Sequence, residues 1–347
     1  MFRPRPRRPM PDEMAQPRTL LLVPVLALVI LVGVEAFAQS AESNAAAAAR
    51  GQSLFGMNVP SLAALEEAES AIGARAGIVG TFADWEHTPD FPRELADAIN
   101  RRGAVPLISW EPWDSWAGGR DQPEYALGSI AAGGHDPLID RWAAQVAAYG
   151  RPVMLRLAPE MNGDWLPWST GVNGNRPGEY AVVWRHVRSR FRRAGADNAV
   201  WVWNPIAPYA GATPLKELFP GTRDVDWLAL DGYNWGASRD WGWQTYADIF
   251  AAGIREIGRL APRHPVMIAE TGSAPDPRKA GWVTETLRDA RVDGVDAVVW
   301  FEFAKENDWR LSETPATAAA AREALAAGEW RQGGDLGVIE RSVGRSR

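Results

Sequence analysis

Short apolar runs alternate with amphipathic helical stretches along the chain from residue 52 onward. Each run is nearly all apolar, as expected for parallel strands that are covered on both faces. The runs occupy residues 53–59, 76–81, 104–110, 152–158, 199–204, 227–233, 265–270 and 297–303. Helical periodicity fills the stretches between them, at 61–72, 92–102, 137–149, 177–194, 245–260, 277–291 and 314–327. Only the connection between the fifth and sixth runs is weak, because it holds just the short segment 214–219.

Eight apolar runs, each followed by a helix or an insertion, predict an α/β fold of one domain, a (β/α)8 TIM barrel over residues 52–330. A doubly wound sheet is the alternative. It is disfavoured because the first run leads into FGMNVPS (55–61), which fits neither the G-x-G-x-x-G nor the P-loop pattern.

Both ends of the chain differ in composition from the barrel region. Basic residues before position 9, an apolar run at 20–34 and the triplet Ala36-Phe37-Ala38 predict a signal peptide over residues 1–38. An uncleaved membrane anchor is the alternative. We expect an Ala-rich linker at 39–51 and a flexible tail at 331–347. The chain is therefore expected to be exported, secreted or periplasmic, and to meet a membrane only through its N-terminal segment.

Composition removes several classes of function. The net charge is -6 and no basic block lies outside the N-terminus, which argues against nucleic acid as a partner. Cysteine is absent, so a disulfide framework, a thiol nucleophile and a Cys-ligated metal are excluded. The 4 His are scattered without ligand spacing, so we expect no metal and no cofactor. The 18 Trp include several in polar segments, 110–116 and 163–169, where indole faces are suited to stacking on sugar rings.

Candidate chemistry lies at the ends of the apolar runs, because barrel active sites form at the carboxyl ends of the strands. Glu160 follows the fourth run and Glu270 ends the seventh. The fourth and seventh strands lie on opposite sides of an eight-strand ring, so these two carboxylates can face each other across its mouth. Paired carboxyls of this kind cleave glycosidic bonds. For either residue alone, a surface carboxylate at a strand end is the simpler interpretation.

The segment LRLAPEMNGDWLPWS (155–169) resembles the fourth-strand motif of family 26 glycoside hydrolases. The resemblance extends to PLISWEPW (106–113), VWVWNP (200–205), DVDWLALDGYNW (224–235), PVMIAETGS (265–273) and VVWFEFAKENDWRL (298–311). It implies a retaining mechanism with Glu160 as the acid/base, Glu270 as the nucleophile and Tyr233 hydrogen-bonded to the nucleophile. Arg156 is expected to point inward, where a structural ion pair is its alternative role. The remaining expected substrate contacts are Trp165, Trp168, Trp300, Asn162, Trp110, Glu111 and Asn204.

One position departs from the mannan-cleaving members of that family, which usually carry His immediately before the acid/base. Here that position is Pro159, which has no side-chain donor or acceptor, so a mannoside 2-hydroxyl contact would have to come from Asn162 or Asn204. We therefore predict a retaining endo-β-glycanase acting on a β-linked polysaccharide or oligosaccharide. β-1,4-mannan, mixed-linkage β-glucan and β-1,3-xylan remain open as substrates. An inactive carbohydrate-binding barrel and a polysaccharide-export accessory protein are the alternative functions.

Overall fold

The computed structural model describes residues 53–327, 330–331 and 339. Its parallel strands form a closed ring, since β1 pairs with β2 on one side and with β8 on the other. The ring is made of β1 (Ser53–Asn58), β2 (Ile78–Asp84), β3 (Val105–Glu111), β4 (Val153–Leu157), β5 (Ala199–Trp203), β6 (Trp227–Asn234), β7 (Val266–Ser273) and β8 (Ala297–Phe301). The predicted (β/α)8 barrel is confirmed, and closure of the ring rules out the open, doubly wound sheet.

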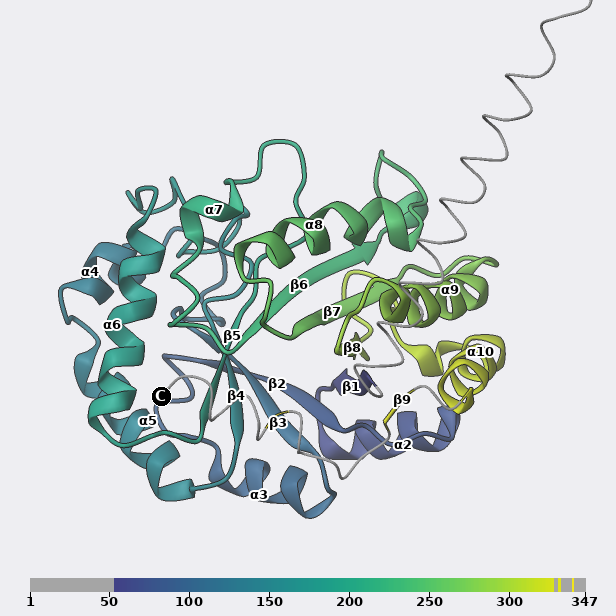
Figure 1. Ribbon diagram of the computed structural model, residues 1–347, viewed down its shortest axis with the longest axis horizontal. Coiled ribbons are helices and arrows are strands. Elements are labelled where there is room, and N and C mark those ends of the chain that lie inside the picture. Colours follow the sequence, from purple (N-terminus) through teal and green to yellow (C-terminus); the bar gives the residue numbers. More distant parts are fainter. Residues whose placement is uncertain (1–52, 328–329, 332–338, 340–347) are drawn as a thin grey trace, which may run out of the picture. The chain divides into compact units, whose positions relative to one another are not determined.

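Helices lie outside the ring and follow the strands in chain order (Figure 1). They are α2 (Leu62–Ile72), α3 (Arg93–Arg101), α4 (Leu127–Ala131), α5 (Asp136–Tyr149), α6 (Glu179–Arg193), α7 (Leu215–Leu218), α8 (Tyr246–Leu260), α9 (Lys279–Val292) and α10 (Pro315–Ala326). Short 3-10 turns add η1 (Pro123–Tyr125), η2 (Gly236–Ser238) and η3 (Leu311–Glu313). The weak connection between the fifth and sixth strands holds only α7, as the sequence indicates.

Local sequence signals explain where several helices begin and end. The Ser61 hydroxyl accepts the backbone N–H of Ala64 at the start of α2, and Thr245 and Thr314 form capping boxes at the starts of α8 and α10. Such caps satisfy backbone donors that have no partner inside the helix. Gly150 ends α5 in the left-handed region with φ of 72°, a conformation that costs glycine little.

Strand alternation divides the apolar residues into two packed layers. Along β4, Met154 belongs to the cluster inside the barrel, whereas Val153 and Leu155 pack in the layer between the strands and the helices. Because successive side chains on a strand point to opposite faces, Arg156 shares the inward face of Met154. The same alternation on the other strands directs a ring of polar side chains into the carboxyl end of the barrel.

The structure describes two residues of the predicted tail, Arg331 and Ile339. Arg331 forms β9 (Trp330–Arg331) with the preceding Trp330 beside β1, and Ile339 is buried with the apolar residues inside the barrel. The predicted signal peptide, the linker and the rest of the tail lie outside the described residues. Within the described part of the chain, no helix is both long and apolar enough to cross a membrane.

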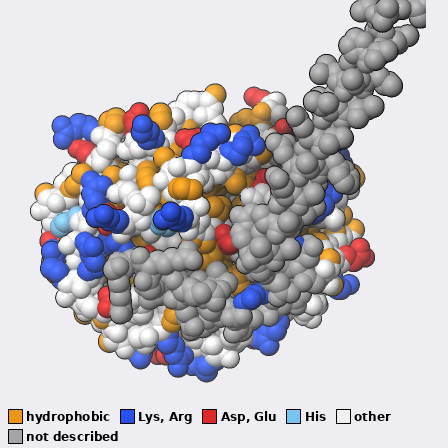
Figure 2. Space-filling model, in the orientation of Figure 1, with side chains coloured by type: hydrophobic (Ala, Val, Ile, Leu, Met, Phe, Trp, Pro, Cys, Tyr) orange, Lys and Arg blue, Asp and Glu red, His pale blue; other side chains and the backbone are white. Residues whose placement is uncertain are grey.

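Surface charge is mixed. On the described part of the face seen in Figure 2, Lys and Arg side chains are spread among acidic and apolar ones and do not merge into a single patch. Binding to the phosphates of a nucleic acid depends on clustered basic side chains. The distribution therefore gives no support to a nucleic-acid partner.

Candidate active site

A β-bulge in β7 determines where Glu270 points. Leu230 of β6 pairs with Ile268, but the next residue, Asp231, pairs with Glu270, so Ala269 is an extra residue in β7. Ala269 already faces the barrel interior, and simple alternation would turn Glu270 outward. The extra residue redirects the strand, as bulges beside functional sites do, and Glu270 enters the mouth of the barrel beside Asp231.

The segment after β4 holds Glu160 in an unusual backbone conformation. Ala158 and Glu160 have φ of 46° and 55°, a region that side chains other than glycine seldom occupy. The backbone N–H of Glu160 donates to the carbonyl of Asn204 at 2.8 Å, and the Trp168 indole donates to the carbonyl of Pro159 at 2.7 Å. These bonds tie the segment to β5 and to its own loop, and so offset the local strain.

Trp165 contacts the carboxylate of Glu160 directly. Its indole N–H donates to Oε2 of Glu160 at 2.9 Å. A Cβ at Gly163 would lie 2.6 Å from two carbons of the Trp165 ring, so the indole can lie against this backbone only because residue 163 is glycine. The G-D-W sequence therefore serves to bring a hydrogen-bond donor to Glu160.

Arg156 lies at the centre of the carboxylate cluster. Its guanidinium donates to Glu270 at 2.7 Å and to Asp231 at 3.1 Å, and the Arg156 side chain is buried. The Tyr233 hydroxyl donates to the other oxygen of Glu270 at 2.6 Å. Glu270 is thus held by one cation and one neutral donor, which together fix the orientation of its carboxyl group.

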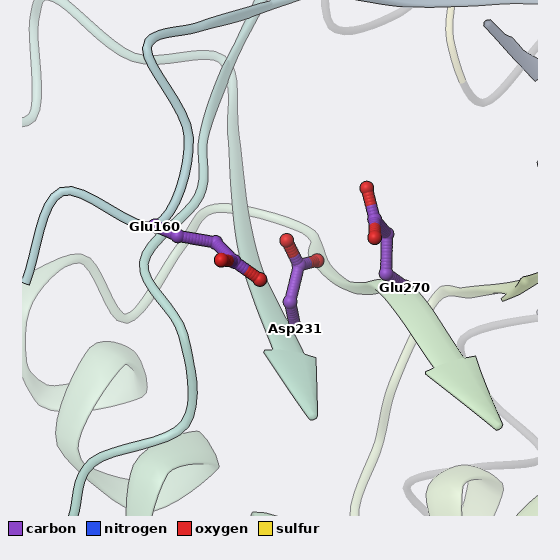
Figure 3. Close-up of side chains that lie close together, drawn as sticks. All are labelled: Glu160, Asp231 and Glu270. Carbon is purple, nitrogen blue, oxygen red and sulfur yellow. The ribbon is translucent and has the colours of Figure 1, made fainter. Parts of the chain in front are cut away.

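Glu160, Asp231 and Glu270 come from three separate strand ends and converge at one point (Figure 3). One carboxylate oxygen of each lies within 4.8 Å of one oxygen of each of the others. Three carboxylates this close could share a cation. The guanidinium of Arg156 already donates hydrogen bonds to two of them, Asp231 and Glu270. The protein itself therefore supplies positive charge to the cluster.

Burial and mutual repulsion separate the acidities of the carboxyl groups. Burial, and secondly the charge of Glu270, raise the pKa of Glu160 to about 7. The same two causes raise the pKa of Glu111, at the end of β3, to about 8. Burial raises the pKa of Asp231 well above its usual range, against the opposing effect of Arg156. Three carboxyl groups of the cluster, Glu160, Glu111 and Asp231, therefore hold a proton to higher pH than they would in water.

Comparisons with known proteins agree with this geometry. The sequence profile of glycosyl hydrolase family 26 matches residues 119–277. Endoglucanase H of Acetivibrio thermocellus is 34% identical over 323 residues, which cover 89% of this chain and 33% of that protein. The chain therefore resembles glycosyl hydrolase family 26 over residues 119–277.

Further proteins are similar over shorter stretches or in fold alone. The β-1,3-xylanase TXYA of a Vibrio species is 29% identical over 189 residues, covering 50% of this chain and 36% of the xylanase. This chain thus spans about a third of the length of these curated relatives. A family 26 β-mannanase structure from Bacteroides ovatus superposes with a TM-score of 0.61 at 18% identity, over 83% of this chain and 92% of the mannanase. That likeness shows a shared fold.

Exposed aromatic rings of this barrel flank the carboxylates on two sides. Trp165, 38% exposed, stacks with Tyr209 from the loop after β5 at 6.1 Å between ring centres. Phe82 of β2 is 41% exposed and packs edge-on against Phe301 and Phe303 at the end of β8. Because β8 lies opposite β4 in the eight-strand ring, the rings of Phe301 and Phe303 stand across the mouth from the segment of Trp165.

Three of the predicted aromatic contacts need correction, since Trp110, Trp168 and Trp300 are fully buried. Trp110 faces the helices and stacks on Trp142 at 4.8 Å, and Trp300 packs against Trp282 of α9. These side chains have no surface to offer a sugar, and we reassign them to packing. The inward residue of β8 is Phe301, one position beyond Trp300.

Of the polar residues expected to contact substrate, Asn162 and Asn204 are engaged inside the protein, whereas Glu111 remains available. Both ends of the Asn162 amide bond the backbone of Ile206, at 2.8 and 2.9 Å, so Asn162 fixes a loop. Asn204 is fully buried and its amide donates to the carbonyl of Pro205. Glu111 is partly exposed and accepts the indole N–H of Trp113 at 3.0 Å. It stays a candidate substrate contact.

The residue that sequence reasoning left without a role is Asp231. It shares the inward face of β6 with Ala229 and Tyr233, and it shares Arg156 with Glu270. Alternation along the strand was the signal that could have found it, because Tyr233 lies two positions further on and enters the same site.

Proposed function

We propose that this chain is a retaining endo-β-glycanase whose substrate is a β-glucan. The observation that carries the proposal is the approach of Glu160 and Glu270, whose nearest carboxylate oxygens lie within 4.8 Å. Retaining enzymes hold their two carboxyls about 5–5.5 Å apart, whereas inverting enzymes leave about 6.5–9.5 Å for a water molecule. The spacing therefore favours direct attack on the sugar by one of the carboxylates.

The raised pKa of Glu160 supports its role as the acid. Glu160, with a pKa raised to about 7, gives its proton to the glycosidic oxygen as that oxygen leaves the anomeric carbon. Glu270, paired with Arg156 and Tyr233, attacks the same carbon and forms an ester. In the second step Glu160, now ionised, takes a proton from water, and the water oxygen displaces Glu270 from the sugar. The net result is hydrolysis with retention of configuration.

Action within a chain, rather than at its end, is supported by the two aromatic groups. Trp165, in its stack with Tyr209, and the rings of Phe301 and Phe303 stand across the mouth of the barrel from each other. Aromatic faces bind the apolar faces of sugars, so sugar units have platforms both before and after the cleavage point.

β-Glucan is favoured over β-mannan by the position before Glu160. Pro159 offers no side-chain donor there, and Asn162, which could have replaced it, is fully engaged with Ile206. The relative that covers most of this chain is named an endoglucanase. β-Mannan is the second candidate, on the strength of relatives that carry that name. We also propose that the chain is exported, on the basis of its N-terminal sequence.

The test is a hydrolysis panel of mixed-linkage β-glucan, β-mannan, β-1,3-xylan and cellulose, with Glu160→Ala and Glu270→Ala beside the unchanged protein. Glu217→Ala, at an exposed position of α7, is the matched control. We expect mixed-linkage β-glucan to be cleaved, with turnover lost in both site variants and kept in the control. Cleavage of β-mannan alone would overturn the substrate. Binding of these glycans without any cleavage would instead support a carbohydrate-binding barrel.

A further inference from the structure

Trp116 stands out in the loop that follows β3. Its side chain is 81% exposed, the highest value among the large exposed apolar residues of the described chain. It belongs to the segment WEPWDSW, whose first tryptophan, Trp110, is buried in the core. The proposed cleavage reaction does not use Trp116, since neither Glu160 nor Glu270 contacts it.

The indole of Trp116 is held in place rather than left to swing in solvent. The His87 ring stacks on one face of it, with 3.8 Å between ring centres and 20° between planes. The backbone N–H of Trp116 donates to Asp114 at 2.9 Å, and the buried Gln122 side chain bonds the backbone of Asp114 on both sides. One face of the indole is therefore backed by His87 and the other is presented to solvent.

His87 is fixed in turn by the end of β2. Asp84 accepts both the backbone N–H of His87 at 2.6 Å and its ring nitrogen Nδ1 at 3.0 Å. The second oxygen of Asp84 accepts the Ser115 hydroxyl, which belongs to the same loop as Trp116. Two neighbouring strand ends thus hold the stacked pair together.

This pair lies at the same mouth of the barrel as the carboxylates. Asp84 pairs in register with Glu111 across β2 and β3, and the charges of Glu270 and Glu160 are close enough to affect the pKa of Glu111. A path of adjacent inward-facing residues therefore leads from Glu270 through Glu111 and Asp84 to the stacked rings. A glycan chain that occupies the cleavage site could extend along this path.

The chemistry of the platform selects one class of ligand. A flat, pre-oriented aromatic face binds the C–H face of a pyranose at little entropic cost. The carboxylates of Asp84 and Asp114 lie beside it, where they favour hydroxyl donors and repel anionic sugars. We propose that Trp116 and His87 form a remote subsite for a neutral hexosyl unit of the polysaccharide that is cleaved. This inference rests on the proposed function.

The test measures binding in the full chain carrying Glu270→Gln, a substitution that should prevent cleavage of the glycans during the titration. Titrations use soluble mixed-linkage β-glucan and a β-glucotriose, with Trp116→Ala and His87→Ala added in turn. Loss of a stacking face should weaken polymer binding about tenfold, with a smaller loss for His87→Ala, while trisaccharide binding stays unchanged. The matched control is Trp241→Ala, because Trp241 is also a strongly exposed tryptophan, at 59%, and has no stacking partner among the described residues.

The outcomes separate this inference from the proposed function. Unchanged polymer binding in Trp116→Ala, or an equal loss in Trp241→Ala, overturns the subsite and leaves the glycanase proposal standing. If the Glu270→Gln parent binds neither polymer nor trisaccharide, the β-glucan proposal fails and the subsite fails with it. Since Trp116 is exposed, its substitution should not lower the midpoint of thermal unfolding, which is recorded beside each titration.

Discussion

Trp165 donates its indole N–H to the carboxylate of Glu160 at 2.9 Å. This hydrogen bond stabilises the ionised form and lowers the pKa of Glu160, whereas burial and the charge of Glu270 raise it to about 7. The proton affinity of the proposed acid is therefore set by a balance in which Trp165 opposes the two larger effects.

Replacing Trp165 with Phe should shift the pH profile of the enzyme. Glu160 must carry a proton to act as an acid, so kcat/KM falls as the pH rises through its pKa, near 7. Trp165→Phe removes the bond that lowers this pKa, and the alkaline limb of kcat/KM should move to higher pH. Tyr209→Leu, which removes the stacking partner of Trp165 but no bond to Glu160, should leave the limb in place. A limb that stays or moves downward in Trp165→Phe contradicts this account.

Tyr233→Phe should reduce turnover without unfolding the barrel. The lost hydrogen bond joins a neutral hydroxyl to a charged carboxylate at 2.6 Å, and such bonds contribute about 1.5–3 kcal/mol. If that contribution orients Glu270 for attack, kcat/KM should fall by about 10- to 150-fold. Steady-state kinetics on the substrate identified by the hydrolysis panel measure the change. An unaltered kcat/KM would mean that the bond has no part in the reaction.

Arg156→Met should destabilise the fold, because it leaves Asp231 and Glu270 buried without their cation. Removing one partner of a buried pair costs about 3–5 kcal/mol. The cost should be greater at pH 7 than at pH 5. The charge of Arg156 opposes the rise in the pKa of Asp231 that burial causes, so the substitution raises this pKa further. A carboxyl with a raised folded pKa loses its contribution to stability as the pH rises, and the variant should therefore lose more than the unchanged protein between pH 5 and pH 7.

Urea denaturation of Arg156→Met at the two pH values checks the effect. Arg188→Met is the matched control, since Arg188 is also a buried arginine, paired with Asp224 at 3.1 Å, but lies on α6 away from the carboxylate cluster. The Arg188→Met variant should be less stable than the unchanged protein, but should keep its activity at temperatures where it is folded. Equal stability of Arg156→Met and the unchanged protein would show that the ion pairs of Arg156 with Asp231 and Glu270 do not stabilise the fold.

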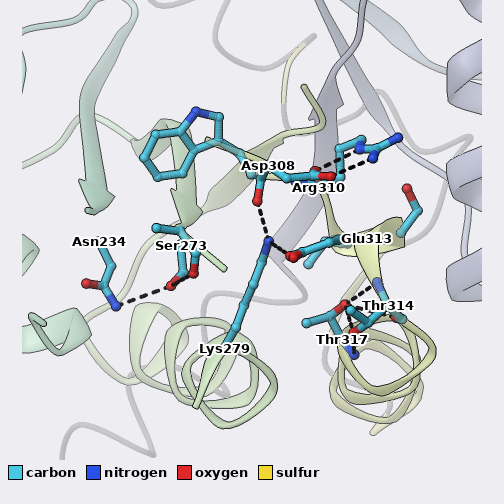
Figure 4. A network of polar contacts seen from close by, with 12 residues as sticks. Asn234, Ser273, Lys279, Asp308, Arg310, Glu313, Thr314 and Thr317 are labelled. Atoms are coloured by element: carbon cyan, nitrogen blue, oxygen red, sulfur yellow. Dashed lines mark hydrogen bonds and ion pairs between the residues drawn. The ribbon is translucent and has the colours of Figure 1, made fainter. Parts of the chain in front are cut away.

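Lys279 anchors the loop that supports Tyr233. Its ammonium group is buried, pairs with Glu313 and donates to the carbonyl of Asp308 at 2.7 Å (Figure 4). The next residue, Trp309, packs against the Tyr233 ring at 4.9 Å. Lys279→Met should cost about 3 kcal/mol of unfolding free energy and should lower kcat by loosening this support.

Arg278→Ala is the control for Lys279→Met. Arg278 is the preceding residue and also forms an ion pair, with Asp276, but on the surface. Exposed pairs contribute little because solvent screens them, so this variant should unfold at nearly the same urea concentration as the unchanged protein. Similar losses in the two variants would show that burial of Lys279 is not the cause.

Much of the site could be predicted from strand alternation and strand order. Arg156 was expected inside the barrel because of its spacing along the fourth strand, and it lies there. Alternation failed where the backbone departs from regular geometry. The bulge at Ala269 turns Glu270 inward, and no feature of the sequence AETG reveals an extra residue in a strand.

The aromatic residues show a second limit of sequence reasoning. Trp300 and Phe301 are adjacent and both apolar, but the register of β8 directs Trp300 to α9 and Phe301 to the mouth. A shift of one residue exchanges the two faces of a strand. The resemblance to family 26 favoured Trp300 as a substrate contact, but only the pairing of β8 with β1 and β7 decides which ring reaches the site.

The central claim is that Glu270 attacks the sugar, and azide rescue of Glu270→Ala tests it most directly. The cavity left by the shortened side chain admits azide, which should attack the anomeric carbon of an activated β-glucoside in place of the missing carboxylate. We predict that turnover is abolished in water alone, is restored by azide, and yields a glycosyl azide of inverted configuration. Full activity of Glu270→Ala without azide would contradict the account.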